Sequence, residues 1–172
     1  MSVSVAIETP LQDDVRALID ALNDHLLPLS PEEFQFKMTV EQMAEPHTTV
    51  FIARDGEGRA VGCGALKMHT GDMAEVKRMY TMPHVRGQRV GVLLLDAIEN
   101  LAREKGVITL MLETGTGEGF AGAWRLYQRS GFVERGAFLD YPESPHSAFF
   151  EMALSRVALA PSTDDAAVST AR

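Results

Sequence analysis

The stretch MAEVKRMYTMPHVRGQRVGVLLLDAIENL, residues 73–101, decides the fold of this chain. Its first ten residues predict a strand that stops at Pro83, because proline cannot continue a central ladder. The loop RGQRVG, residues 86–91, comes next, and the residues after it carry apolar side chains at the spacing of an amphipathic helix. Backbone N–H groups at a helix start are unpaired and lie at the positive end of the helix dipole. This loop is therefore a candidate phosphate site.

The loop alone leaves two interpretations open. It is neither a dinucleotide-binding GxGxxG loop nor a Walker loop, since Gly87 and Gly91 are its only glycines and no lysine follows them. From spacing alone, an ordinary connection between a strand and a helix explains this segment as well as a phosphate site does.

Secondary-structure signals extend on both sides of this stretch. Upstream we expect a strand over 4–7, a helix from Thr9-Pro10 to just before Pro28 with Gln12 in a capping box, an irregular helical arm over 30–46, and a hairpin of strands over 48–53 and 60–69. Downstream we expect a strand over 107–114, a helix over 120–130, and strands over 132–135 and 148–154. This order of strands and helices predicts an α/β protein.

Composition excludes several classes of protein. The 172 residues suit one domain, which we expect over 1–155, and residues 156–172 have the composition of a disordered tail. Sixteen Lys and Arg against 24 Asp and Glu give a net charge of −8, which argues against binding to nucleic acid or to an anionic membrane surface. No signal peptide or membrane-spanning run is recognisable, and a single cysteine makes no internal disulfide, so we expect a cytoplasmic protein.

Three motifs resemble those of the GCN5-related N-acetyltransferases. The loop over residues 86–91 is similar in place and register to the family's acetyl-CoA loop, Arg/Gln-x-x-Gly-x-Gly/Ala, although Arg89 stands where the first family glycine is usual. The segment MYTMP, residues 79–83, resembles the one before that loop, and LYQRSGF, residues 126–132, resembles the family's Leu-Tyr-x-x-x-Gly-Phe ending. The resemblance covers residues 4–154 and implies the family fold, a mixed, mostly antiparallel central sheet flanked by helices.

The resemblance also implies an acetyl-CoA site where the strands over 73–82 and 107–114 splay apart. The pantetheine arm would pair with the backbone of the first strand, an amide there would stabilise the thioester oxyanion, and the pyrophosphate would lie on the loop amides. The implied cofactor-binding residues are Met79, Tyr80, Thr81, Arg86, Gly87, Gln88, Arg89, Val90, Gly91 and Val92. Phe120 stands where many members have an asparagine that contacts the cofactor.

Three residues are candidates for proton transfer. The resemblance implies that Tyr127 protonates the departing thiolate, whereas simple packing is the alternative for a tyrosine in a helix. An alkylamine, with a pKa of about 10, must lose a proton before it attacks. Glu75 is the first candidate base, because strand alternation places it on the face of Met79 and Thr81, and Glu113 on the next strand is the second. Both match positions that family members use, and a solvated carboxylate at a strand edge is the alternative for each.

The function that the resemblance implies is direct transfer of acetyl from acetyl-CoA to a primary amine, on a small molecule rather than a protein. No covalent enzyme intermediate is needed, so Cys63 is expected in the core, and the histidines show no spacing for a metal site. The acidic net charge favours a cationic acceptor, and residues 138–147 are expected to border its site. Members of the family often form dimers, so a homodimer is also expected. A degenerate acyl-CoA-binding or regulatory module is the alternative, because Arg89 and Phe120 replace usual cofactor contacts.

Overall fold

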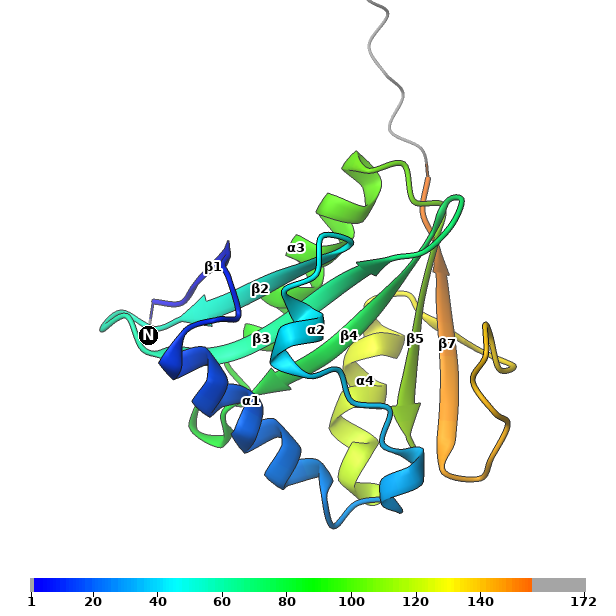
Figure 1. The fold of residues 1–172 in the computed structure, drawn as a ribbon, viewed down its shortest axis with the longest axis horizontal. Coiled ribbons are helices and arrows are strands. Elements are labelled where there is room, and N and C mark those ends of the chain that lie inside the picture. Colours follow the sequence, from blue (N-terminus) through cyan, green and yellow to red (C-terminus); the bar gives the residue numbers. More distant parts are fainter. Residues whose placement is uncertain (1, 156–172) are drawn as a thin grey trace, which may run out of the picture.

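A seven-stranded sheet in the order β1-β2-β3-β4-β5-β7-β6 crosses the molecule in the computed structural model, which describes residues 2–155 (Figure 1). The strands are β1 (Ser4–Ile7), β2 (Thr48–Arg54), β3 (Ala60–Met68), β4 (Met73–Thr81), β5 (Thr109–Gly115), β6 (Val133–Arg135) and β7 (Ser147–Ala153). Every neighbouring pair is antiparallel except β4 with β5, which is parallel. The predicted mixed, mostly antiparallel sheet is confirmed.

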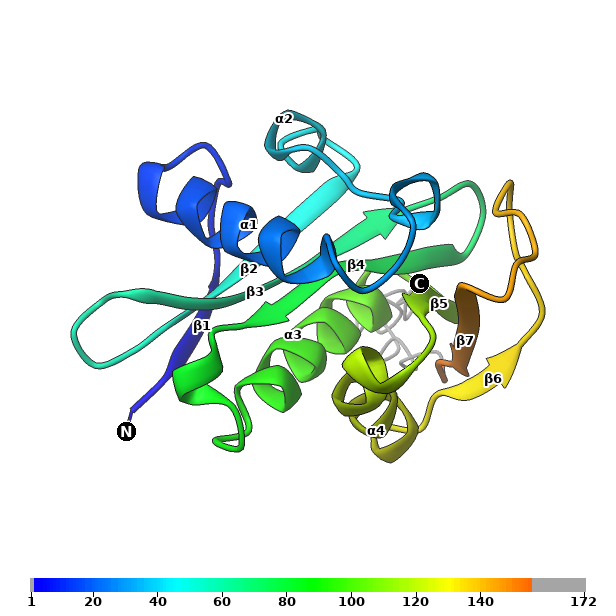
Figure 2. The ribbon, with the colours of Figure 1, turned by 90° about the horizontal axis from the view of Figure 1, so that it is seen from below.

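Helices cover both faces of the sheet (Figure 2). On one face, here called the α1 face, lie α1 (Asp13–Leu26), the 3-10 turn η1 (Glu32–Phe34) and α2 (Val40–Met43). On the other, the α3 face, lie α3 (Val90–Glu104) and α4 (Ala121–Arg129), each preceded by a 3-10 turn, η2 (Pro83–Val85) and η3 (Glu118–Phe120). The arm between α1 and β2 is thus helical and irregular, as its prolines predict.

Apolar side chains at helical spacing anchor α1 and α3 to the sheet. On α3, Leu94, Leu95 and Ile98 are fully buried in a cluster that reaches from β2 to β7. On α1, Val15 and Ile19 are buried against the opposite face. Burying each such side chain stabilises the fold by about 1.5–3 kcal/mol. The start of α3, with Val90 buried, is consequently held beside the sheet.

The predicted elements are all present, but α1 starts later than predicted. It begins at Asp13 with Gln12 at the N-cap, and no side chain caps it. The Thr9 hydroxyl accepts from the Leu11 amide instead, and the Gln12 side chain donates to the Thr9 carbonyl at 2.8 Å. The predicted capping box is therefore wrong, because a local turn takes both polar groups first. The tail predicted over 156–172 lies outside the described residues.

A bulge interrupts β4 beside β3. Two β4 residues, Arg78 and Met79, lie opposite Gly64 alone, so the register of the two strands shifts by one residue. Arg78 takes the left-handed conformation, with φ 57°, which allows the extra residue to fit. Bulges of this kind redirect the side chains that follow them.

This bulge reverses the alternation of β4 side chains. Register places Glu75, Lys77 and Tyr80 on the α1 face, and Tyr80 packs in the α1 cluster. Met79 packs against the apolar cluster that contains the α3 side chains. By the register with β3, Thr81 lies on that same α3 face. The expectation that Glu75 shares a face with Met79 and Thr81 is therefore wrong, since strict alternation does not hold across a bulge.

Candidate active site

A cavity opens where the two central strands separate. β4 and β5 pair only through residues 73–75 and 109–111, which confirms the predicted splay beyond that point. The space that results measures about 1000 Å³. It is lined by residues 76–81 of β4, 113–115 of β5, 85–92 apart from 88, parts of α4, the end of α1, and 34–37 of the arm. Of the predicted cofactor-binding residues, all except Gln88 line this cavity; the Gln88 side chain donates to the His84 carbonyl at 3.2 Å.

Unpaired amides from the start of α3 line the cavity. The first bond of the helix runs from the Leu93 amide to the Arg89 carbonyl, at 3.0 Å. The amides of Val90, Gly91 and Val92 precede it and have no intrahelical acceptor, and no N-cap side chain bonds to them. Together with the helix dipole, these donors suit a phosphate group without a basic surface.

Arg89 keeps the loop in the shape that a glycine would favour. Its φ is 64°, in the left-handed region, and Gly87 nearby has φ 81°. The conformation costs an L-residue about 1–2 kcal/mol. Arg89 thus adopts the left-handed conformation that glycine favours, and both Arg89 and Arg86 line the cavity.

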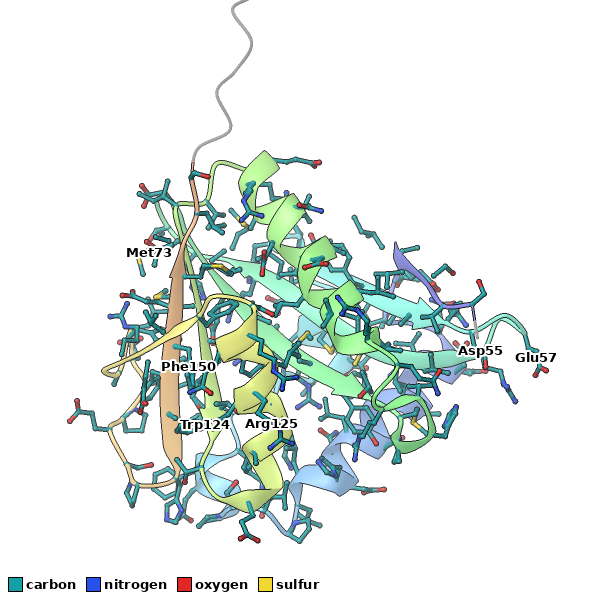
Figure 3. The ribbon with its side chains drawn as sticks, turned by 180° about the vertical axis from the view of Figure 1, so that it is seen from behind. Asp55, Glu57, Met73, Trp124, Arg125 and Phe150 are labelled. Atoms are coloured by element: carbon teal, nitrogen blue, oxygen red, sulfur yellow. The ribbon has the colours of Figure 1, made fainter. Side chains whose placement is uncertain are left out.

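Tyr127 lies in the wall formed by α4. Its ring packs against Phe132 and Phe150, with centroids 5.9 and 6.3 Å away. Figure 3 shows Trp124 and Arg125 on the same helix, and Trp124 meets Phe150 edge-on at 5.2 Å. Burial and the charge of Glu113 raise the pKa of Tyr127, so its hydroxyl stays protonated. This protonated hydroxyl belongs to a residue that lines the cavity.

Phe120 and Gly115 form an apolar part of the wall. A Cβ added to Gly115 would lie 2.2 Å from the Phe120 ring, so the ring lies directly on the end of β5. The Gly115 carbonyl accepts from the Trp124 indole at 2.9 Å. Phe120 thus makes a packing contact at the position where the family resemblance implies a polar one.

Glu113 is a cavity residue whose carboxylate is partly buried. It lines the space from the α1 face of β5, and its Oε2 atom is buried without a hydrogen-bond partner among residues 2–155. Burial raises the pKa of Glu113 to about 7, against the lowering effects of the Lys77 ammonium and of the neighbouring Ser147 hydroxyl. A carboxylate in this state accepts a proton near neutral pH.

Glu75 lies behind the cavity wall instead. Its side chain is 2% exposed and is absent from the lining. One carboxylate oxygen is 3.0 Å from His69 Nε2, and the other accepts from the Tyr141 hydroxyl and lies 3.5 Å from Lys77 Nζ. The structure brings Glu113, but not Glu75, to the same cavity as Tyr127.

Two residues of the cavity wall, Lys77 and Arg78, are not predicted from the sequence as site residues. Lys77 lines the cavity and donates to the Tyr141 hydroxyl at 2.7 Å, although no residue of 138–147 is itself in the lining. Arg78 lines the cavity from the bulge. The sequence does contain a signal for Lys77 and Arg78: they are consecutive basic residues in a strand that otherwise has the pattern of a buried one. Basic side chains are seldom buried without a polar partner.

Cys63 belongs to the core, as expected. It is fully buried on β3, and its thiol donates to the Arg78 carbonyl at 3.2 Å. Burial raises the pKa of Cys63 to about 12, so the reactive thiolate does not form at neutral pH.

Comparison with known proteins identifies the class to which this fold and cavity belong. The model of the acetyltransferase (GNAT) family matches residues 17–132. The "IAA acetyltransferase" of Azospirillum brasilense is 40% identical over 154 residues, which covers 89% of this chain and 99% of the relative. A solved Klebsiella pneumoniae protein assigned as an acyl-CoA N-acyltransferase is 34% identical, with a TM-score of 0.73 over 89% of this chain and 98% of the other.

A more distant structure shares the fold. The PaiA N-acetyltransferase from Thermoplasma acidophilum, solved with coenzyme A, has a TM-score of 0.70 at 17% identity and covers 90% of this chain and 100% of its own. The chain belongs to the GNAT acetyltransferase family and is an acyl-CoA-dependent acetyltransferase.

Neither a membrane-spanning helix nor a metal-binding cluster occurs in the described part of the chain. Within residues 2–155, no helix is long and apolar enough to cross a membrane. No cluster of three or more His, Cys, Asp or Glu side chains in that part of the chain is arranged to hold a metal ion.

Proposed function

We propose that this protein transfers the acetyl group of acetyl-CoA to the primary amine of a small molecule by direct attack. The observation that carries the proposal is the meeting of three features in one cavity: the α3 amides, the buried carboxylate of Glu113 and the protonated hydroxyl of Tyr127. They correspond to the three requirements of the reaction, which are an anion site, a base and an acid.

The residues around the start of α3 would hold the acyl donor. The amides of Val90, Gly91 and Val92 suit its pyrophosphate, and the guanidinium groups of Arg86 and Arg89 add charge-assisted contacts. Backbone amides of residues 79–81, next to the splay, supply donors for the thioester oxygen as it gains negative charge. The coenzyme A bound to the PaiA neighbour supports this occupant.

Glu113 is proposed as the base in place of Glu75. It lines the cavity, has an unpartnered oxygen and has a pKa of about 7, whereas Glu75 is enclosed by three polar neighbours. Glu113 would take the proton of the ammonium, and the free amine nitrogen would form a bond to the thioester carbon. As the C–S bond breaks, Tyr127 would donate its proton to the departing thiolate, and the second proton lost by the nitrogen would return to the Tyr127 oxygen. Glu75 would position Tyr141 and Lys77 at the rim.

The test is turnover of acetyl-CoA with a panel of amines, measured as free thiol. Thiol release that depends on one class of amine, with mass-spectrometric detection of the N-acetylated product, is the expected result. Reactions without amine, and reactions with tertiary amines of the same size, serve as controls. Tight binding of CoA with no turnover on any primary amine would instead favour a degenerate acyl-CoA-binding module.

A further inference from the structure

Arg78 is a buried cation without a counter-charge. Only 9% of the residue is exposed. One guanidinium nitrogen donates to the Asn23 side-chain oxygen on α1, and Nε is buried without a hydrogen-bond partner. Arg78 takes part in no ion pair among residues 2–155. Its positive charge is therefore uncompensated by the described part of the chain.

Such an arrangement is costly unless a ligand completes it. A buried charge without a partner is unfavourable, and burial lowers the pKa of Arg78 from its usual value. The residue also adopts the left-handed conformation, at a cost of about 1–2 kcal/mol for an L-residue. Both costs arise at a residue that lines the cavity, where unfavourable features are often maintained for binding.

The other cations that line the cavity are either paired or in contact with water: Lys77 is paired, Lys37 is half-buried, and Arg86, Arg89, Arg125 and Arg129 are exposed. Lys77 donates to the Tyr141 hydroxyl at 2.7 Å and lies 3.5 Å from the Glu75 carboxylate. Glu113 holds an unpartnered oxygen and accepts a proton from the amine in the proposed reaction. The cavity thus offers a site for an ammonium group at Glu113, and a buried, uncompensated cation for an anion at Arg78.

We infer that the acceptor carries an anionic group, a carboxylate or a phosphate, close to its amine, and that the guanidinium of Arg78 binds this group. The inference rests on the proposed function, which places the amine at Glu113. The net charge of −8 alone favours a simple cationic acceptor. The inference specifies instead an acceptor that carries charges of both signs. A planar guanidinium with free N–H groups suits both anions.

The activity test uses matched pairs of amines that differ only in the anion. Amino acids are compared with their amides, and phosphoethanolamine with ethanolamine, by kcat/KM for acetyl transfer. A charge-assisted hydrogen bond predicts a preference of roughly ten- to hundredfold for one kind of anionic member. A preference within the amino-acid pairs indicates a carboxylate acceptor, and a preference within the phosphoethanolamine pair indicates a phosphate acceptor. In Arg78→Gln the preference should fall to about one, while the KM for acetyl-CoA stays the same.

A second variant neutralises Arg78 without removing it. Asn23→Asp puts a carboxylate of nearly the same shape on the guanidinium, so the fold gains an ion pair and keeps its packing. We expect this variant to unfold at an equal or higher temperature and yet to lose the preference for anionic amines. A purely structural Arg78 would retain that preference in Asn23→Asp.

Binding keeps the inference separable from the proposed function. Calorimetric titration of the CoA-loaded protein with the same pairs shows whether the anionic member binds more tightly, and whether Arg78→Gln removes the difference. Selective binding without any turnover would support the anion site and overturn the proposed function. Equal turnover and equal binding of both members would overturn the anion site alone. A raised KM for acetyl-CoA in Arg78→Gln, with the preference intact, would also overturn it, since Arg78 would then serve the acyl donor.

Discussion

The Glu113 side chain is largely buried, and its Oε2 atom has no hydrogen-bond partner among residues 2–155. Both features affect how the carboxyl ionises. Because burial raises the pKa of Glu113 to about 7, its basic form becomes dominant only as the pH passes neutrality. We expect kcat/KM to rise with pH through this region, and Glu113→Gln to lower it by roughly a hundredfold or more and to remove the rise. Thiol-release rates from pH 5.5 to 9 measure both effects.

Glu75→Gln is the matched control for this prediction. Glu75 lies on the adjacent strand and is outside the cavity lining, so its variant should keep the rise near pH 7. If Glu75→Gln removed that rise while Glu113→Gln kept it, the base would be Glu75, as sequence reasoning ranks first.

The Glu113 carboxyl should also make the free energy of unfolding decrease as the pH rises. Its pKa moves from a usual value of 4.5 to about 7 in the folded chain, so between these pH values the folded state holds more protons than the unfolded state. The free energy of unfolding then decreases as the pH rises across this window. Glu113→Gln should therefore stabilise the protein more at pH 8 than at pH 4.5. Urea denaturation at both pH values checks this, and an equal effect at the two would contradict it.

Tyr127→Phe isolates the acid step, because the ring packing against Phe132 and Phe150 is retained. We expect a drop in kcat of roughly tenfold to a thousandfold, with little change in the affinity for acetyl-CoA. Steady-state kinetics and calorimetric binding separate the two quantities. Trp124→Phe, one turn earlier on α4, controls for packing changes; unchanged turnover in Tyr127→Phe would remove Tyr127 from the acid role.

At the scale of elements, Arg89 at the junction of the loop with α3 has two opposing effects: its backbone is strained, and its side chain supplies a cation. Arg89 holds a left-handed conformation at the N-cap and adds a cation beside the unpaired amides. Arg89→Gly should raise the free energy of unfolding by up to about 1 kcal/mol, since glycine adopts φ 64° without strain. It should also weaken CoA binding. Thermal unfolding and CoA titration at low and high salt test both; an affinity unchanged at low salt would exclude a contact with phosphate.

The elements differ in how far the sequence could predict them. α3 and its loop could be predicted, because apolar spacing and glycine positions are local signals. The β4 bulge could not, since two residues oppose one only when β3 is in place, and it moved Glu75 to the other face from Met79. The enclosure of Glu75 depends on Tyr141, 66 residues further along the chain. No local pattern contains that contact.

At the scale of the whole molecule, one apolar cluster joins the two sides of the splayed sheet. It includes Phe51 and Val61 on one side, Leu112 and Phe150 on the other, and Leu94 of α3 between them. We therefore expect residues 1–155 to unfold as one cooperative unit, in accord with the predicted single domain. The single tryptophan, Trp124, reports on α4 beside β7. Its fluorescence and the far-ultraviolet circular dichroism should give coincident urea transitions; separate midpoints would show two units.

The burial of Cys63 has a practical consequence for measuring this enzyme. It is the only cysteine of the chain, it is fully buried, and burial raises its pKa to about 12. Chromogenic disulfide reagents, which are used to measure free thiol, react with thiolates. The folded protein should therefore add no absorbance of its own to the assay. Every colour change would then count one molecule of coenzyme A released. A slow reaction of Cys63 with the reagent would, in turn, report how often β3 opens to solvent.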